Sequence, residues 1–179
     1  MPAGAEPVVI LLSGPSSAGK TALAGALQRR LPLPAVWVEA DRSFPAVPTT
    51  HPGWESSGRS PAAVVLAFHR SLAAWVEAGF HLIVDGSLPY GDLGLRDQCL
   101  AMFDAYDLRL VAVVCSVAIL NEREASRPES RPAGWAATQA VDIHDGLRFA
   151  AEVDTSTRTP DACAEDVIAQ LDLDVARPS

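Results

Sequence analysis

A glycine-rich segment near the N-terminus carries the residue types that bind phosphate groups. The whole G-x-x-x-x-G-K-[ST] pattern is present in Gly14, Pro15, Ser16, Ser17, Ala18, Gly19, Lys20 and Thr21. Its glycines let backbone N–H groups converge on phosphate oxygens at a helix N-terminus. Lys20 would place a compact positive charge on the β and γ oxygens, and the Thr21 hydroxyl would bind Mg²⁺. The segment predicts a nucleoside triphosphate site; a glycine-rich turn that binds nothing is the alternative.

Two aspartates follow short apolar runs elsewhere in the chain. Asp85 comes directly after the run 81–84, and Asp41 closes the run 36–40. Side chains at the carboxyl ends of parallel strands meet at one crevice of the sheet. There, Asp85 would hold Mg²⁺ through water, and Asp41 would take the proton of an acceptor hydroxyl as a general base. Each could instead be an ordinary turn aspartate.

Three arginines recur every four residues, at Arg123, Arg127 and Arg131, in a segment interrupted by two prolines. Guanidinium groups suit the charge that spreads over a transferring phosphoryl group. The pattern predicts a lid over about 123–134 whose closure excludes water, with at least one of these arginines acting on the reaction. A solvated helix face with ion pairs to neighbouring glutamates is the alternative.

Two further side chains are candidates for contact with an acceptor. His144 stands late in an expected helix, although a lone histidine there is more often a satisfied core or surface residue. Trp54 lies in the irregular stretch from Arg42 to Ser60 and could form a pocket wall.

Apolar runs and helical periodicity alternate along the chain. Strands are expected at 8–12, 36–40, 81–84, 108–115 and 152–154. Helices are expected at 20–31, 61–79, 93–106, 116–125, 135–149 and 160–171. This alternation predicts an α/β fold with a five-stranded parallel sheet and helices on both faces. We expect a single domain over residues 1–179, with its core at about 8–173.

Composition excludes several classes of partner. The net charge of −8 would repel nucleic acid and anionic lipid. The run from Val8 to Leu12 is too short for a signal peptide or a membrane span. Three widely spaced cysteines fit free thiols better than disulfides or a metal site. We therefore expect a cytoplasmic protein with a small-molecule partner, and the sequence does not address its oligomeric state.

In these features the chain resembles the chloramphenicol phosphotransferase family, small kinases with a P-loop fold. The likeness extends over about residues 8–171. It rests on the ordered set Ser13–Thr21, Asp41, Ile83–Asp85, Asn121–Arg127, Ala140–Gly146 and Glu152–Ser156.

The resemblance implies a P-loop kinase fold with sheet order 2-3-1-4-5 and an ATP- and Mg²⁺-dependent O-phosphotransferase. In such an enzyme the γ-phosphoryl group of ATP moves to a hydroxyl of an antibiotic, chloramphenicol in the founding member, as resistance or self-protection. It also implies that Asp41 is the base, that Arg123 and Arg127 contact the nucleotide, and that Asp154 and Thr155 lie near adenine.

The chain departs from the family pattern on the acceptor side. Asp85 is followed by Gly86 where the family has a second aspartate, and the stretch 43–60 does not match. Another acceptor is therefore open: a nucleoside, a sugar acid or a shikimate-like acid, for which Arg42, Arg59 and Arg96 are the candidate cations. A non-catalytic ATP-binding switch protein is the alternative from another class.

Overall fold

The computed structural model describes residues 6–48, 50–126, 132 and 134–173 and contains one parallel sheet. Its strands follow the order β2-β3-β1-β4-β5, which confirms the predicted five-stranded α/β architecture. The strands are β1 (Val8–Ser13), β2 (Ala35–Glu39), β3 (His81–Asp85), β4 (Asp107–Val114) and β5 (Ala151–Asp154).

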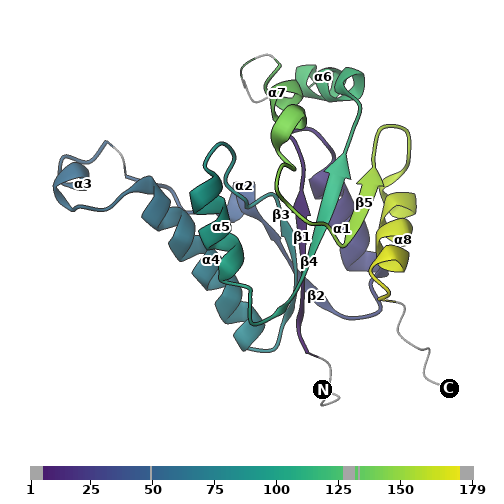
Figure 1. Ribbon diagram of the computed structural model, residues 1–179, viewed down its shortest axis with the longest axis horizontal. Helices are drawn as coiled ribbons and strands as arrows, with labels where there is room; N and C mark the ends of the chain where they lie inside the picture. The colour runs from purple at the N-terminus through teal and green to yellow at the C-terminus, as the bar shows by residue number, and fades with distance from the viewer. Residues whose placement is uncertain (1–5, 49, 127–131, 133, 174–179) are drawn as a thin grey trace.

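Helices cover both faces of this sheet (Figure 1). Helices α4 and α5 lie on one face and α1 and α8 on the other, while α6 and α7 stand beyond the carboxyl ends of the strands. The helices are α1 (Lys20–Arg30), α2 (Ala40–Ser43), α3 (Gly53–Ser56), α4 (Pro61–Glu77), α5 (Leu93–Ala101), α6 (Val117–Ala125), α7 (Trp135–Asp142) and α8 (Pro160–Gln170).

The central strand β1 divides its side chains between two cores. Val8, Ile10 and Leu12 pack on the side of α1 and α8, whereas Val9 and Leu11 pack on the side of α4. All six residues of β1 are buried. This two-sided burial explains why the sequence of β1 is an apolar run without alternation.

Several helix boundaries differ from the sequence expectation. The Ser60 side chain accepts a hydrogen bond from Ala63 N–H and starts α4, as Ser-Pro predicts. By contrast, α5 ends at Ala101 and α7 at Asp142, because hydrogen-bonded turns replace the final helical residues expected there. Strand β2 ends at Glu39, so Asp41 stands in the first turn of α2 rather than at the strand end.

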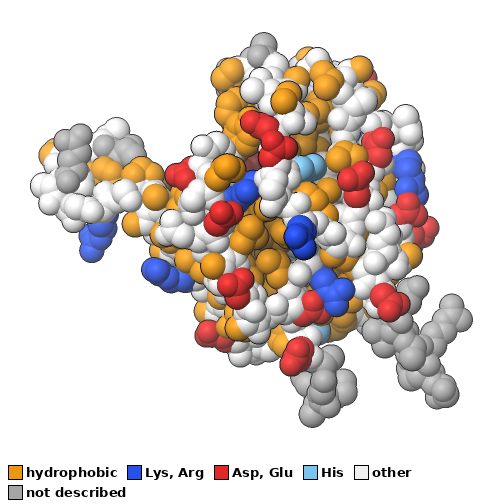
Figure 2. Space-filling view, in the orientation of Figure 1, with side chains coloured by type: hydrophobic (Ala, Val, Ile, Leu, Met, Phe, Trp, Pro, Cys, Tyr) orange, Lys and Arg blue, Asp and Glu red, His pale blue; other side chains and the backbone are white. Residues whose placement is uncertain are grey.

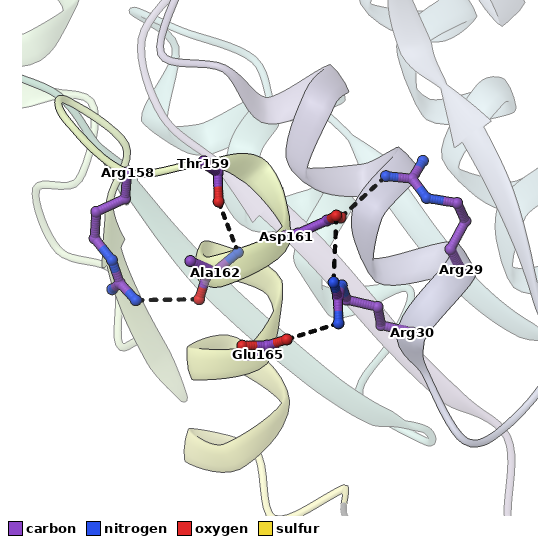
Figure 3. Close-up of polar contacts among 7 residues, drawn as sticks. All are labelled: Arg29, Arg30, Arg158, Thr159, Asp161, Ala162 and Glu165. Atoms are coloured by element: carbon purple, nitrogen blue, oxygen red, sulfur yellow. Dashed lines mark hydrogen bonds and ion pairs between the residues drawn. The ribbon is translucent and has the colours of Figure 1, made fainter.

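Ion pairs join α1 and α8 at the surface (Figure 3). An Arg29 nitrogen lies 3.1 Å from an Asp161 oxygen, and an Arg30 nitrogen lies 2.6 Å from Glu165 Oε1. These side chains are between 37% and 65% exposed, so each pair contributes at most about 1 kcal/mol. The apolar core beneath them therefore holds the two helices.

The segment between α2 and α4 forms an arm that extends away from the sheet and carries α3 at its far end (Figure 1). In the described residues, no helix has the length and apolar character needed to cross a bilayer.

The turn after β1 has no room for a side chain at Gly14. A Cβ atom there would lie 2.2 Å from the carbonyl oxygen of Val113 in β4. We expect Gly14→Ala to lower the free energy of unfolding by about 1–3 kcal/mol. Gly25→Ala in α1 is the matched control, because its Cβ would have no contact closer than 3.5 Å. That variant should be about 0.4–1 kcal/mol more stable than the wild type. Urea unfolding measures both; equal effects would contradict the packing argument.

A buried histidine makes stability depend on pH. His69 is fully buried in α4, and its Nδ1–H donates to Val65 O at 2.9 Å. Its Nε2 has no hydrogen-bond partner among the residues that the structure describes. Burial lowers the pKa of His69 below its usual value of 6.5. The unfolded chain therefore binds this proton more readily, and stability should fall as pH drops below about 6.5. Urea unfolding at pH 7.5 and 5.5 should show a smaller loss for His69→Leu; an unchanged loss would contradict this account.

Candidate active site

A cavity of about 490 Å³ opens at the carboxyl edge of the sheet. It is lined by the Gly14–Thr21 loop, the start of α2, the segment after β3, and residues of α5, α6, α7 and the β5–α8 connection. In the view of Figure 2, apolar side chains lie among acidic and basic ones on the surface of the molecule. The cavity lining likewise contains apolar residues such as Leu88 and charged residues such as Lys20. The cavity therefore has both the polar groups that bind phosphates and an apolar surface.

The Gly14–Thr21 loop presents unused polar groups. The Oγ atoms of Ser16 and Ser17 are buried, and no described residue forms a hydrogen bond with them. Ser17 and Gly19 have φ angles of 62° and 86°, in the left-handed region, which turns successive N–H groups toward one side. The N-terminus of α1 also has no side-chain cap. Unsatisfied donors at a helix N-terminus fit an anion, as the sequence predicted for a phosphate.

Three side chains from other elements form hydrogen bonds with the backbone of this loop. Gln139 Oε1 of α7 accepts a hydrogen bond from Ser16 N–H at 2.8 Å, and Thr155 Oγ1 donates to Ala18 O at 2.6 Å. Arg123 Nη2 donates to Thr155 O at 2.7 Å, and its Nη1 lies 3.5 Å from Ser17 O. Arg123 and Thr155 thus stand beside the loop and line the cavity.

Oxygen donors suited to a divalent cation lie beside Lys20. Thr21 Oγ1 donates a hydrogen bond to Asp85 Oδ2 at 2.6 Å, and Asp85 is 5% exposed. A hydroxyl and a carboxylate are hard ligands of the kind that Mg²⁺ binds, and both line the cavity. Among the described residues, no group of three or more His, Cys, Asp or Glu side chains is arranged around a metal site. A Mg²⁺ ion would therefore depend on these two residues, on water and on the phosphates.

The Lys20 side chain contacts the backbone of the loop that precedes it. Its Nζ donates to the carbonyl oxygens of Gly14 and Pro15, both at 2.9 Å. Gly86 has a φ of 76°, and a Cβ atom there would lie 3.1 Å from Lys20 Cε. A larger residue at position 86 would press on the lysine, which gives a physical reason for glycine after Asp85 in this chain.

Two carboxylates line the cavity where an acceptor would meet the phosphates. Asp41 stands in the first turn of α2, and Glu39 ends β2. Arg42 Nε lies 3.3 Å from Glu39 Oε2, whose side chain is 21% exposed. The cavity therefore offers two candidate bases, of which the sequence analysis considered only Asp41.

Apolar and aromatic residues form the adjoining wall: Leu88, Pro89, Tyr90, Ile143 and Leu147. Tyr90 OH donates to Asp142 Oδ1 at 2.8 Å, and this hydrogen bond raises the pKa of Tyr90. The Tyr90 ring also meets the Trp135 ring edge-on, with centroids 5.8 Å apart. These contacts join the segment after β3 to α7 across the cavity.

Three predicted residues beyond the Gly14–Thr21 loop lie outside this cavity lining. His144 Nε2–H donates to Ser13 O at 3.2 Å, behind the loop. Asp154 accepts hydrogen bonds from the N–H and Oγ of Ser156, which lower the pKa of Asp154. Trp54 is a correction: α3 carries it on the arm, away from the carboxyl edge of the sheet.

The loop residues Pro15 and Ala18 contribute backbone contacts but do not line the cavity. Arg127 and Arg131, with most of the predicted lid, lie outside the described residues.

Sequence reasoning missed several lining residues, among them Gln139, Glu39 and Arg158. Glu39 had a weak signal, since it is the polar residue that ends an apolar run. Gln139 had none, because only the packing of α7 brings it to Ser16.

Known proteins share this arrangement. Residues 7–172 match the family described as chloramphenicol phosphotransferase-like protein. No curated protein sequence matches the chain at a significant level.

Solved structures show the same fold at low sequence identity. A gluconokinase from Sinorhizobium meliloti 1021 has 17% identity and a TM-score of 0.64, with 94% of each chain covered. The APS kinase of Mycobacterium tuberculosis, in complex with AMPPNP and APS, has 16% identity and a TM-score of 0.63, with 94% of this chain and 99% of that chain covered. A tunicamycin resistance protein from Deinococcus radiodurans has 19% identity and a TM-score of 0.62, with 96% and 99% covered.

Since the family match spans nearly the whole sheet and the cavity at its edge, the chain belongs to the chloramphenicol phosphotransferase-like family and is a small-molecule kinase with a P-loop kinase fold.

Proposed function

We propose that this chain transfers the γ-phosphoryl group of ATP to a hydroxyl of a small-molecule antibiotic, as a resistance or self-protection activity. The main support for the proposal is that Lys20, Thr21 and Asp85 line the same cavity as Asp41 and an apolar wall. The family match supports an antibiotic acceptor, and the similarity to a tunicamycin resistance protein is consistent with it.

In the proposed reaction the acceptor hydroxyl oxygen attacks the γ-phosphorus in line with the leaving oxygen of ADP. A bond forms between the acceptor oxygen and phosphorus, the bond between phosphorus and the β–γ bridging oxygen breaks, and the hydroxyl proton passes to Asp41. Lys20 neutralises phosphate charge, and Arg123 supports the loop that binds the phosphates. Mg²⁺ held by Thr21 and Asp85 would supply further positive charge.

The position of the cavity walls supports separate sites for the two substrates. Arg123, Thr155 and Arg158 line the side near the β5–α8 connection, which suits the nucleotide. Asp41, Tyr90 and Leu147 line the acceptor side. An apolar wall also removes water from the phosphoryl group and so limits hydrolysis of ATP.

A metabolic kinase that acts on a hydroxy acid is the second candidate. The observation that favours it is Arg96, a buried arginine that lines the same cavity. The gluconokinase among the similar structures makes a sugar acid a reasonable member of the test panel.

The acceptor is found by measuring ADP release with Mg²⁺-ATP and each compound of a panel, with mass spectrometry for the added phosphate. The panel contains chloramphenicol, tunicamycin, nucleosides, gluconate and shikimate. A phosphorylated antibiotic would support the first candidate and a phosphorylated hydroxy acid the second. ATP binding without any phosphorylated product would contradict both and favour a nucleotide-binding switch.

The base assignment is tested with Asp41→Asn. We expect normal ATP affinity and at least a tenfold lower kcat, because general-base catalysis contributes roughly 10²-fold or more. Glu39→Gln tests the neighbouring carboxylate, and Asp104→Asn, an exposed residue after α5, is the control for a lost charge. Full turnover by Asp41→Asn would show the assignment to be wrong, and a selective loss in Glu39→Gln would move the role to Glu39.

A further inference from the structure

Arg96 is a buried cation that the proposed reaction does not use. It lies on α5 and is 7% exposed, yet it lines the cavity on the acceptor side. Burying a guanidinium removes it from water, and this cost is offset only where hydrogen-bond acceptors replace the lost water. The partners of Arg96 therefore indicate what the cavity is built to hold.

The protein satisfies this guanidinium incompletely. Arg96 Nη1 donates to the carbonyl oxygen of Asp145, in the turn after α7, at 2.8 Å. Arg96 Nε lies 3.6 Å from Asp97 Oδ1, which is beyond hydrogen-bond distance, and is buried without a hydrogen-bond partner in the described part of the chain. A guanidinium has five N–H donors in a fixed planar fork. Within the described residues, Arg96 Nε thus remains a donor without an acceptor.

The charges around the cavity restrict where such an acceptor group could bind. Asp41, Glu39 and Asp85 line the region near the phosphate loop and would repel an electron-rich group there. Arg96 lines the same cavity from α5, together with Leu88, Pro89 and Tyr90 of the segment after β3. A molecule with a hydroxyl at one end and an oxygen-rich group at the other would be oriented by these opposite charges.

The geometry points to Arg96 as an acceptor-specificity residue that binds a planar group with two oxygen atoms, a carboxylate or a nitro group, on the molecule to be phosphorylated. The inference rests on the proposed function, since it takes the acceptor to bind beside Asp41. Arg96 would fix the orientation of the acceptor, and it plays no part in the chemical step.

Equilibrium binding to the full chain with AMPPNP and Mg²⁺ tests this role without requiring turnover. Two matched pairs of ligands serve as probes, titrated by calorimetry. Chloramphenicol is compared with its analogue in which hydrogen replaces the nitro group, and gluconate is compared with glucitol. The first pair tests a neutral two-oxygen group and the second a carboxylate.

We expect the wild type to bind the oxygen-bearing member of at least one pair about tenfold to a hundredfold more tightly. Arg96→Met should remove that preference while leaving the affinity for AMPPNP unchanged. Arg96→Lys should restore only part of it, because an ammonium lacks the planar fork. Arg70→Met, an exposed arginine on α4, is the matched control and should keep the full preference.

A wild-type chain without preference in either pair, or one that binds neither oxygen-bearing ligand, would overturn the inference. So would a preference that survives in Arg96→Met. The ligand comparison in the wild type keeps the test decisive if Arg96→Met fails to fold. An Arg96-dependent preference without phosphate transfer would uphold this role and reject the proposed function, so the two can fail separately.

Discussion

The close approach of the turn after β1 to strand β4 is the constraint on which the site depends. Gly14 has no space for a Cβ atom beside Val113, so the backbone that follows β1 lies in close contact with β4. The following residues turn with left-handed φ angles at Ser17 and Gly19. The Ser16 and Ser17 hydroxyls are then buried without a hydrogen-bond partner in the described part of the chain. Such a loop is unfavourable by itself. Hydrogen bonds with Gln139, Thr155 and Arg123, which line the same cavity, fix the shape of this loop.

These supporting contacts make α7 part of the phosphate site even though it lies far from the loop in sequence. Glu124 of α6 accepts hydrogen bonds from the N–H groups of Gly134 and Ala136, both at 3.0 Å, at the start of α7. At the other end of α7, Gln139 bonds to Ser16 and Asp142 bonds to Tyr90. One short helix therefore links α6, the phosphate loop and the acceptor wall.

The sequence predicted the sheet well because its signals are local. The run of β1 is apolar on both faces, and Ser60-Pro61 marks a helix start by its own chemistry. The order of the strands came from a family resemblance. The sequence could not give the lengths of α5 and α7, since turns compete with further helical residues at their ends. The sequence could not place Trp54 relative to the cavity, because an irregular segment has no periodicity that fixes its direction.

Within the site, the predictable residues are those that carry a motif, and the others depend on packing. Lys20 and Thr21 could be found from the glycine-rich motif and Asp85 from its place at a strand end. Gln139 and Arg96, by contrast, reach the cavity from α7 and α5. The local charges of the cavity differ from the net charge of the chain. A chain with a net charge of −8 repels a nucleotide at long range, yet Lys20, Arg123 and Arg158 line the donor side of the cavity. Since screening limits the long-range repulsion to about 8–10 Å at physiological salt, these local cations would attract the nucleotide in the proposed reaction. In that reaction the carboxylates and Arg96, which line the same cavity, would meet the acceptor, so that charges of both signs would orient the two substrates.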